Sequence, residues 1–257
     1  MKAVPILLAA FVLAACQNVP LTGRSQLNII SAQQETRMGL ASFKEILDRE
    51  TLSDDRAASE RVRRVGRRIA AATGRADYQW EFRLIEDDKQ INAFCLPGGK
   101  VAVYSGLLPV AGDDAGLAAV IGHEVAHAIA RHGGERLSQE ILVAGLTVAT
   151  VAATQDPKQR DLYAGLLGAG AAVGFLLPYS RLHESEADRM GLIYMAKAGY
   201  DPRAALGLWE RMAEAGKGKA KPPEFLSSHP ADATRIKDIR RWLPEALGHY
   251  RPGRPVP

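Results

Sequence analysis

The sequence predicts an α+β fold that is mostly helical and contains one small antiparallel sheet. Most of the chain reads as apolar stretches at helical spacing, separated by Gly and Pro. Between Tyr78 and Tyr104 the residues alternate apolar and polar instead, with a turn at Pro97-Gly98-Gly99, which is typical of strands. The 257 residues are 47% hydrophobic and 24% charged. A chain of this composition can bury one medium-sized core, so disorder is excluded as the general state.

The first fifteen residues have the pattern of a bacterial lipoprotein signal peptide. Lys2 precedes an apolar run from Ile6 to Ala15 that is too short to cross a bilayer. Small residues directly before Cys16 resemble a lipobox, so we expect cleavage before Cys16 and lipidation of this residue. The alternative is an ordinary signal peptide with an incidental cysteine. Gln17, where an aspartate would retain the protein at the inner membrane, predicts the periplasmic face of the outer membrane.

After this leader we expect an extended tether over residues 16–30, one domain over residues 31–247 and a disordered tail over residues 248–257. Three strands are expected at 78–85, 91–96 and 100–104. Helices are expected at 31–49, 53–72, 114–132, 141–153, 162–177, 183–198, 201–215 and 231–242, most of them bounded by capping residues or glycine.

Two of these helices, at 141–153 and 162–177, carry no charge. Each is shorter than the roughly 20 residues that a membrane span needs, so we expect buried or interfacial helices rather than a spanning hairpin. The helix at 53–72 carries a cluster of five arginines, for which contact with anionic lipid or nucleic acid is the alternative to a solvated face: Arg61, Arg63, Arg64, Arg67 and Arg68. No aromatic residue lies between those arginines, so we expect no nucleic-acid partner. Lipidation of Cys16 leaves Cys95 without a disulfide partner, and we expect a buried structural thiol there.

The segment His123-Glu124-Val125-Ala126-His127 indicates a metal site. Residues four apart lie on one face of a helix, so the two imidazoles can bind one zinc ion, with Glu124 beside it. Buried histidine and glutamate side chains are costly without partners, and a metal ion supplies one. Asp113 or Asp114 is the expected N-cap of this helix, and Gly133-Gly134 is its expected end.

A catalytic zinc site needs a third protein ligand. The extended pattern with a glycine at 130 and a histidine at 133 is excluded, because the chain has Ala130 and Gly133. Glu184 on a later helix is the expected third ligand. Asp188, four residues on and hence on the same face, is expected to accept a hydrogen bond from a ligand histidine. We expect His183 and Glu186 to lie at the surface.

Several motifs together resemble the M48 family of zinc metallopeptidases. These are the His123–His127 motif, Ser180-Arg181 with Glu184 and Asp188, the segment Asn92-Ala93-Phe94-Cys95-Leu96-Pro97-Gly98-Gly99, and Ser228-His229-Pro230 with Arg235. The lipobox and the nearby Thr22-Gly23-Arg24 are similar to the outer-membrane lipoprotein branch of that family. The resemblance covers residues 16 to 243 and implies a zincin-like metallopeptidase domain with one zinc ion per chain.

The resemblance also implies roles for individual residues. His123, His127 and Glu184 would hold zinc, and Glu124 would act as general base and then pass its proton to the leaving amine. Asp188 would orient a ligand or donate a proton, and His229 would stabilise the oxyanion, occupy the fourth zinc position or simply cap a helix. Asn92 and Phe94 would bind substrate as an added strand.

The substrates expected from this resemblance are unfolded or misassembled cell-envelope proteins, with the membrane reached through the lipid anchor. The rival interpretation is a periplasmic chaperone or assembly factor for outer-membrane proteins whose zinc site is latent or plugged.

Overall fold

The structure is a computed structural model that describes residues 16–154, 156–159, 161, 177–217, 223–229 and 233–252. The expected signal peptide (1–15) and most of the expected helix at 162–177 therefore lie outside the described residues. The chain divides into two compact units. The first comprises Met1–Ala32 and Arg131–Glu184, and the second comprises Gln33–Ala130 and Ser185–Pro257.

The first unit contains a short hairpin and a long helix. Strands β1 (Cys16–Asn18) and β2 (Ser25–Leu27) pair antiparallel, within the segment for which the sequence predicted an extended tether and an entry strand. β2 packs against α6 (His132–Ala153). Two hydrogen bonds join the chain after β2 to this helix and the residue before it: Ile29 N–H donates to Ser138 Oγ at 2.9 Å, and the Arg131 guanidinium donates to the Ile30 carbonyl at 2.6 Å.

The outer part of α6 is apolar and exposed. Ile141, Leu142, Leu146 and Val148 are each at least 46% exposed. The buried alternative for the helix at 141–153 is therefore wrong, because no described part of the chain covers these side chains, and the interfacial alternative stays a prediction. Among the described helices, α6 alone is long and apolar enough to cross a membrane by length and composition.

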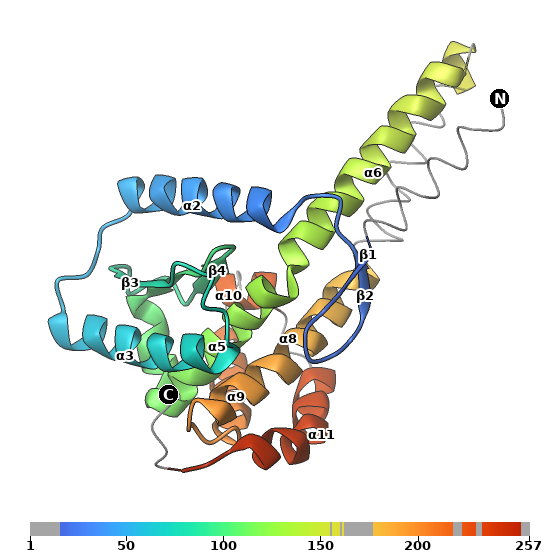
Figure 1. Cartoon of the computed structure of the whole chain (residues 1–257). Helices are drawn as coiled ribbons and strands as arrows, with labels where there is room; N and C mark the ends of the chain where they lie inside the picture. Colours follow the sequence, from blue (N-terminus) through green and yellow to red (C-terminus); the bar gives the residue numbers. More distant parts are fainter. Residues whose placement is uncertain are drawn as a thin grey trace. The chain divides into compact units, whose positions relative to one another are not determined.

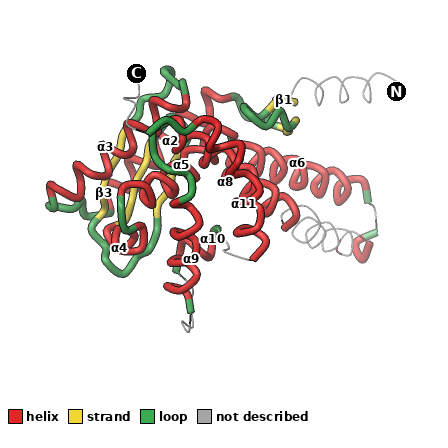
Figure 2. Tube along the Cα trace, turned by 90° about the horizontal axis from the view of Figure 1, so that it is seen from below, coloured by secondary structure: helices red, strands yellow, loops and turns green. Residues whose placement is uncertain are grey.

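The second unit is built on a three-stranded sheet. Its strands are β3 (Glu81–Ile85), β4 (Ala93–Leu96) and β5 (Lys100–Tyr104), in the order β3-β5-β4. β4 and β5 are antiparallel and joined by the expected Pro-Gly-Gly turn, but β3 runs parallel to β5. The prediction of an all-antiparallel sheet is therefore wrong. Figure 2 shows these strands side by side among the helices of the same unit.

Helices cover both faces of this sheet (Figure 1). α2 (Ala32–Arg49) packs Phe43 against Ile85, Ala102 and Tyr104 on one face. On the other face α3 (Arg56–Thr73) approaches so closely that a Cβ at Gly66 would lie 2.2 Å from the Phe82 ring. α3 is capped by Asp55, which accepts from Ala58 N–H, and ends at the left-handed Gly74. After β5 the chain passes through a short 3₁₀ turn (Ser105–Leu107) and α4 (Leu108–Ala111).

The second unit also contains α5 (Asp114–Ala130), which is buried along nearly its whole length. Asp113 is its N-cap, as expected: its side chain accepts from Gly116 N–H at 2.9 Å. The predicted end at Gly133-Gly134 is wrong, because Arg131 adopts a left-handed φ of 60° and both glycines lie within α6. The other helices are α8 (Leu177–Lys197), α9 (Ala204–Gly216), α10 (Glu224–Ser228) and α11 (Ala233–His249).

α5 and α8 meet at a pair of glycines. A Cβ built on Gly191 would lie 2.9 Å from the backbone nitrogen of His123, and one built on Gly122 would lie 3.0 Å from the Gly191 carbonyl oxygen. The two backbones therefore touch, next to His123 on α5 and three residues after Asp188 on α8. Only glycine permits this approach, which brings the two functional side chains within bonding distance.

We predict that Gly191→Ala destabilises the protein by about 1–3 kcal/mol, because a methyl group must push α8 away from α5. Gly145→Ala is the matched control, since nothing lies within 4 Å of a Cβ at this helical position. Its higher helix propensity should raise stability by up to about 1 kcal/mol. Urea unfolding of both variants tests this, and equal stability of Gly191→Ala and wild type would contradict the packing argument.

Candidate metal centre

Two histidines and a glutamate reach the site from one turn of α5. His123 is 2% exposed and Glu124 is 4% exposed, whereas His127 is half-buried. The helix is fixed beneath them by apolar side chains, among them Leu117, Ile121 and Val125, which are fully buried. The local sequence therefore dictates the placement: the apolar residues anchor the helix, and the histidine spacing of four puts both imidazoles on one face.

Ring nitrogens of three histidines converge in the second unit. His127 Nε2 lies 3.1 Å from His123 Nε2, which lies 3.2 Å from Nδ1 of His229 in the segment after α10. Ligand atoms of all three lie within 4.8 Å of one another. In a tetrahedral zinc site with Zn–N bonds of 2.0–2.1 Å, neighbouring nitrogens are roughly 3.3–3.4 Å apart. The spacing between neighbours and the donor chemistry both suit one zinc ion.

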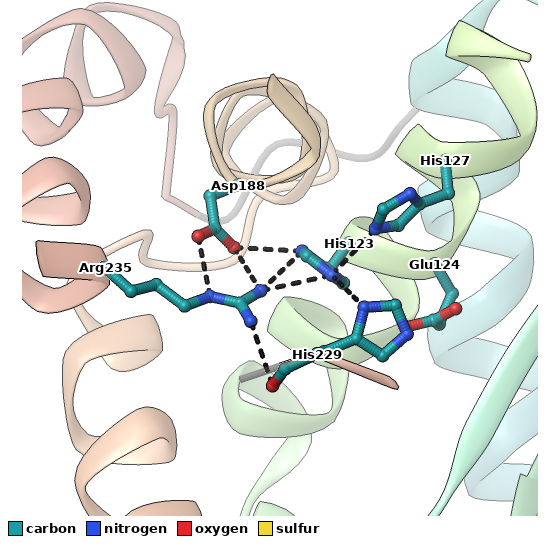
Figure 3. Close-up of polar contacts among 6 residues, drawn as sticks. All are labelled: His123, Glu124, His127, Asp188, His229 and Arg235. Carbon is teal, nitrogen blue, oxygen red and sulfur yellow. Dashed lines mark hydrogen bonds and ion pairs between the residues drawn. The ribbon is translucent and has the colours of Figure 1, made fainter. Parts of the chain in front are cut away.

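Asp188 and Arg235 hold His123 in place (Figure 3). His123 Nδ1 lies 2.9 Å from Asp188 Oδ1, and the Arg235 guanidinium donates to both Asp188 oxygens at 2.7 and 2.8 Å. The proton on Nδ1 then points at Asp188 and the lone pair of Nε2 points at the other histidines. Arg235 also lies over the Trp209 ring at 3.4 Å and donates to the His229 carbonyl at 3.4 Å.

The charge on Asp188 is stabilised despite its burial. Burial alone would raise the pKa of this carboxyl, but the positive charge of Arg235 and the hydrogen bond from His123 outweigh it and hold the pKa below its ordinary value. Asp188 is therefore an ionised acceptor at neutral pH. This favours the orienting role over proton donation.

Glu124 and His229 face each other across the site. His229 Nε2 lies 3.5 Å from Glu124 Oε1, while its Nδ1 points at His123 (Figure 3). His229 therefore stands beside both the ligand nitrogens and the expected general base. A helix-capping role alone does not account for this position, because both ring nitrogens are directed into the site.

The structure also shows where the remaining predicted residues of the later helix and the cysteine of β4 lie. Glu184 lies one helical turn before Asp188 in the same uninterrupted helix, α8. Cys95 is partly buried, and burial raises the pKa of its thiol well above the ordinary value, which excludes a reactive thiolate at neutral pH. His183 and Glu186 are 2% and 6% exposed, so the prediction that they lie at the surface is wrong.

The sequence identified Arg235 only as part of a motif and did not predict its pairing with Asp188. Arg235 follows His229 by six residues, and its partner Asp188 lies 47 residues earlier in the chain. No periodicity connects residues so far apart. The one signal that the sequence offered was an arginine and an aspartate, of opposite charge, each within a motif assigned to the same site.

A pair of histidines on one helix, a neighbouring glutamate and an aspartate behind one imidazole define a metallopeptidase-type centre. The comparison with protein families agrees. Residues 56–243 match the profile of peptidase family M48, and this chain belongs to that family. Metallopeptidases of the family use zinc, in agreement with the donor set described above.

Relatives come from both mitochondria and bacteria. The chain is 39% identical over 231 residues to the mitochondrial metalloendopeptidase OMA1 of Schizosaccharomyces pombe, covering 89% of this chain and 66% of that protein. It is 30% identical over 237 residues to the β-barrel assembly-enhancing protease of Yersinia pestis, covering 90% of this chain and 48% of the relative. The Escherichia coli protease of that name is 27% identical over 232 residues, with coverage of 88% and 47%. The chain thus spans about half of the length of the two bacterial relatives and about two thirds of the length of the yeast one.

We predict that Asp188→Asn destabilises the metal-free protein at pH 7 by about 3–5 kcal/mol, because the buried Arg235 loses its charged partner. A lowered folded-state pKa means that Asp188 stabilises the fold above its unfolded pKa of about 3.9 and loses that effect as the pH falls through the folded value. The difference between wild type and variant should therefore shrink below about pH 4.

Urea unfolding from pH 7 to pH 3 in the presence of a chelator measures this difference. Asp77→Asn is the control, because it breaks an exposed pair with Arg75 that contributes about 1 kcal/mol or less. A difference between wild type and Asp188→Asn that stays constant down to pH 3 would contradict the argument.

Proposed function

We propose that the chain is a zinc-dependent endopeptidase that hydrolyses peptide bonds of misfolded or unassembled cell-envelope proteins. The observation that carries this proposal is the convergence of the His123, His127 and His229 nitrogens directly in front of Glu124. Such a constellation offers a metal-binding position beside a buried carboxylate. A purely structural zinc site would not need that carboxylate.

In this proposal His123, His127 and Glu184 are the zinc ligands. Support for Glu184 comes from α8 itself: residues four apart lie on the same face of a helix, so Glu184 shares the face of Asp188, whose carboxylate contacts His123. A carboxylate with two imidazoles is a common ligand set of catalytic zinc. His229 then stands at the fourth position, which water must occupy during catalysis.

A bound zinc ion would supply Lewis acidity and lower the pKa of its water towards about 7. Glu124 would then act as the general base that takes a proton from the attacking water and passes it to the leaving amine. Its burial removes competing solvent, and the position of His229 Nε2 allows a hydrogen bond either to Glu124 or to the developing oxyanion. Asp188 and Arg235 keep His123 oriented during this cycle.

The edge strand β4 supports peptide binding. It lies at one side of the sheet and packs against α5, the helix that carries the histidines. A substrate added as a further strand would gain affinity from backbone hydrogen bonds and little sequence selectivity, which suits unfolded substrates. Phe94 packs its ring against Phe43 and Tyr104, and the Asn92 carbonyl accepts a hydrogen bond from Tyr104 N–H on β5. We therefore propose that Asn92 and Phe94 flank the backbone groups at the outer edge of β4 that would pair with a substrate.

The cell envelope is the proposed location. The bacterial relatives are named for enhancing β-barrel assembly, and the lipobox predicts lipidation of Cys16 at the periplasmic face of the outer membrane. We therefore propose that the chain is attached to the membrane through the lipid anchor and that its substrates are unfolded or misassembled envelope proteins.

The second candidate is a chaperone or assembly factor for outer-membrane proteins with a latent zinc site. The position of His229 favours this second candidate, because an imidazole bound to the metal would exclude the water molecule that hydrolysis needs. His229→Ala separates two roles of this residue. Activity that rises in the variant indicates a plug, whereas activity that falls indicates a hydrogen-bond donor to the oxyanion.

We predict that Glu124→Gln lowers the rate of casein or unfolded-porin cleavage by at least about 100-fold, because a general base contributes about 10²–10⁴. The variant should still bind one zinc ion per chain, as measured by elemental analysis. Glu45→Gln, at an exposed helical pair with Arg49, is the control and should retain full activity. Equal activity of Glu124→Gln and wild type would overturn the peptidase proposal in favour of the binding module.

We also predict that Cys16→Ser releases the protein from the outer-membrane fraction, because a multi-acyl anchor at this residue would supply the attachment. Cys95→Ser is the matched control and should remain in that fraction. Fractionation of cells that express each variant measures the distribution. Pelleting of Cys16→Ser with membranes would show that residues other than Cys16, such as the exposed apolar side chains of α6, are sufficient for attachment.

A further inference from the structure

The first unit contains a buried ionic network that the proposed chemistry does not use. Glu135 on α6 accepts two hydrogen bonds from the Arg24 guanidinium, at 2.9 and 2.7 Å, and one from His183 Nε2 at 2.9 Å. Arg24 comes from the β1–β2 hairpin, and His183 from the first half of α8. The network therefore joins three separate segments of the unit at one carboxylate.

Arg24 is partly exposed, whereas the other two members of the network are strongly shielded from solvent. Glu135 and His183 are each 2% exposed, and the His183 ring stacks on His132 with centroids 4.3 Å apart and an interplanar angle of 12°. Burial alone would raise the pKa of Glu135, but the hydrogen bonds from His183 and Arg24 lower it to about 2. The carboxylate is therefore ionised, and its negative charge is matched by the guanidinium.

Stability alone is a poor reason for such a network. Replacing a buried ion pair by well-packed apolar side chains is often neutral or stabilising, because desolvation offsets the attraction. A network of this kind can instead select one relative orientation of the segments that it joins, where apolar packing alone would allow several. A nearby group that needs a fixed geometry would account for the network.

That group is Glu184, the residue directly after His183. Two adjacent residues are about 100° apart around a helix, so a fixed His183 ring also fixes the rotation of α8 about its own axis at this turn. The carboxylate of a helical glutamate lies roughly 5–6 Å from the axis, so a rotation of about 20° moves it by about 2 Å. Metal–ligand distances tolerate only about 0.2 Å.

We propose that Arg24 and Glu135 are positioning residues for the zinc ligand Glu184, acting through His183. The inference rests on the proposed function, because it takes Glu184 as a ligand. It assigns a role to the hairpin that follows Cys16: the segment next to the expected lipid anchor helps to set the geometry of the zinc site. Outer groups that orient metal ligands typically change metal affinity or activity by 10–100-fold when they are removed.

The test uses the full mature chain with Arg24→Ala, Arg24→Lys and Glu135→Gln. Zinc dissociation constants are measured by competition with a chelator, at a temperature where circular dichroism shows each metal-free variant to be folded. The visible spectrum of the cobalt-substituted protein then reports the ligand geometry directly. Arg189→Ala is the matched control. Arg189 lies on α8 and, like Arg24, donates two hydrogen bonds to one glutamate, here Glu245, both at 2.8 Å.

We expect Arg24→Ala and Glu135→Gln to bind zinc 10–100-fold more weakly and to change the cobalt spectrum. Arg24→Lys should be intermediate, because lysine keeps the charge but not the paired hydrogen bonds. Arg189→Ala should bind zinc within about twofold of wild type. Variants that lose thermal stability but keep the wild-type zinc affinity and cobalt spectrum would overturn the positioning role.

Glu184→Ala separates this inference from the proposed function. If Glu184→Ala loses zinc while Arg24→Ala binds it like wild type, the ligand assignment stands and only the positioning role fails. If Glu184→Ala retains one tightly bound zinc ion, the ligand assignment fails and the inference fails with it.

Discussion

The hydrogen bond between His123 Nδ1 and Asp188 is the interaction on which the rest of the site depends. It selects the tautomer of His123, directs Nε2 toward the other imidazoles and requires α5 and α8 to lie in backbone contact. The Gly122–Gly191 crossing permits that contact. Arg235 neutralises the aspartate and also reaches His229, so one guanidinium connects the orienting carboxylate to the residue that we propose for the fourth ligand position.

The sequence predicted what depends on local spacing. The histidines four residues apart on one helix, the Asp113 cap and the Pro-Gly-Gly turn between β4 and β5 are all short-range features, and the structure confirms them. The ionisable pairs that hold the site together span tens of residues. Asp188 meets Arg235 across 47 positions and Arg24 meets Glu135 across 111, which no helical or strand period connects.

The errors share that cause. His183 and Glu186 resemble surface residues when α8 is considered alone, and their burial comes from packing against other segments. The parallel pairing of β3 with β5 arises because β4 intervenes along the chain yet pairs on the far side of β5. For the helix at 141–153 the sequence left a buried and an interfacial position open, and the exposure of α6 beyond Ser138 excludes the buried one, because the described chain leaves that surface uncovered.

Family membership and the geometry of the imidazoles support our proposal of a zinc peptidase in which two helices supply the ligands and His229 lies at the position that water needs. Anomalous diffraction at the zinc edge from crystals of the zinc-loaded protein tests this account most directly. We predict one peak per chain, about 2.0–2.2 Å from Nε2 of His123, Nε2 of His127 and a carboxylate oxygen of Glu184. A peak bound elsewhere, or a Glu184 carboxylate beyond bonding reach of the metal, would contradict it.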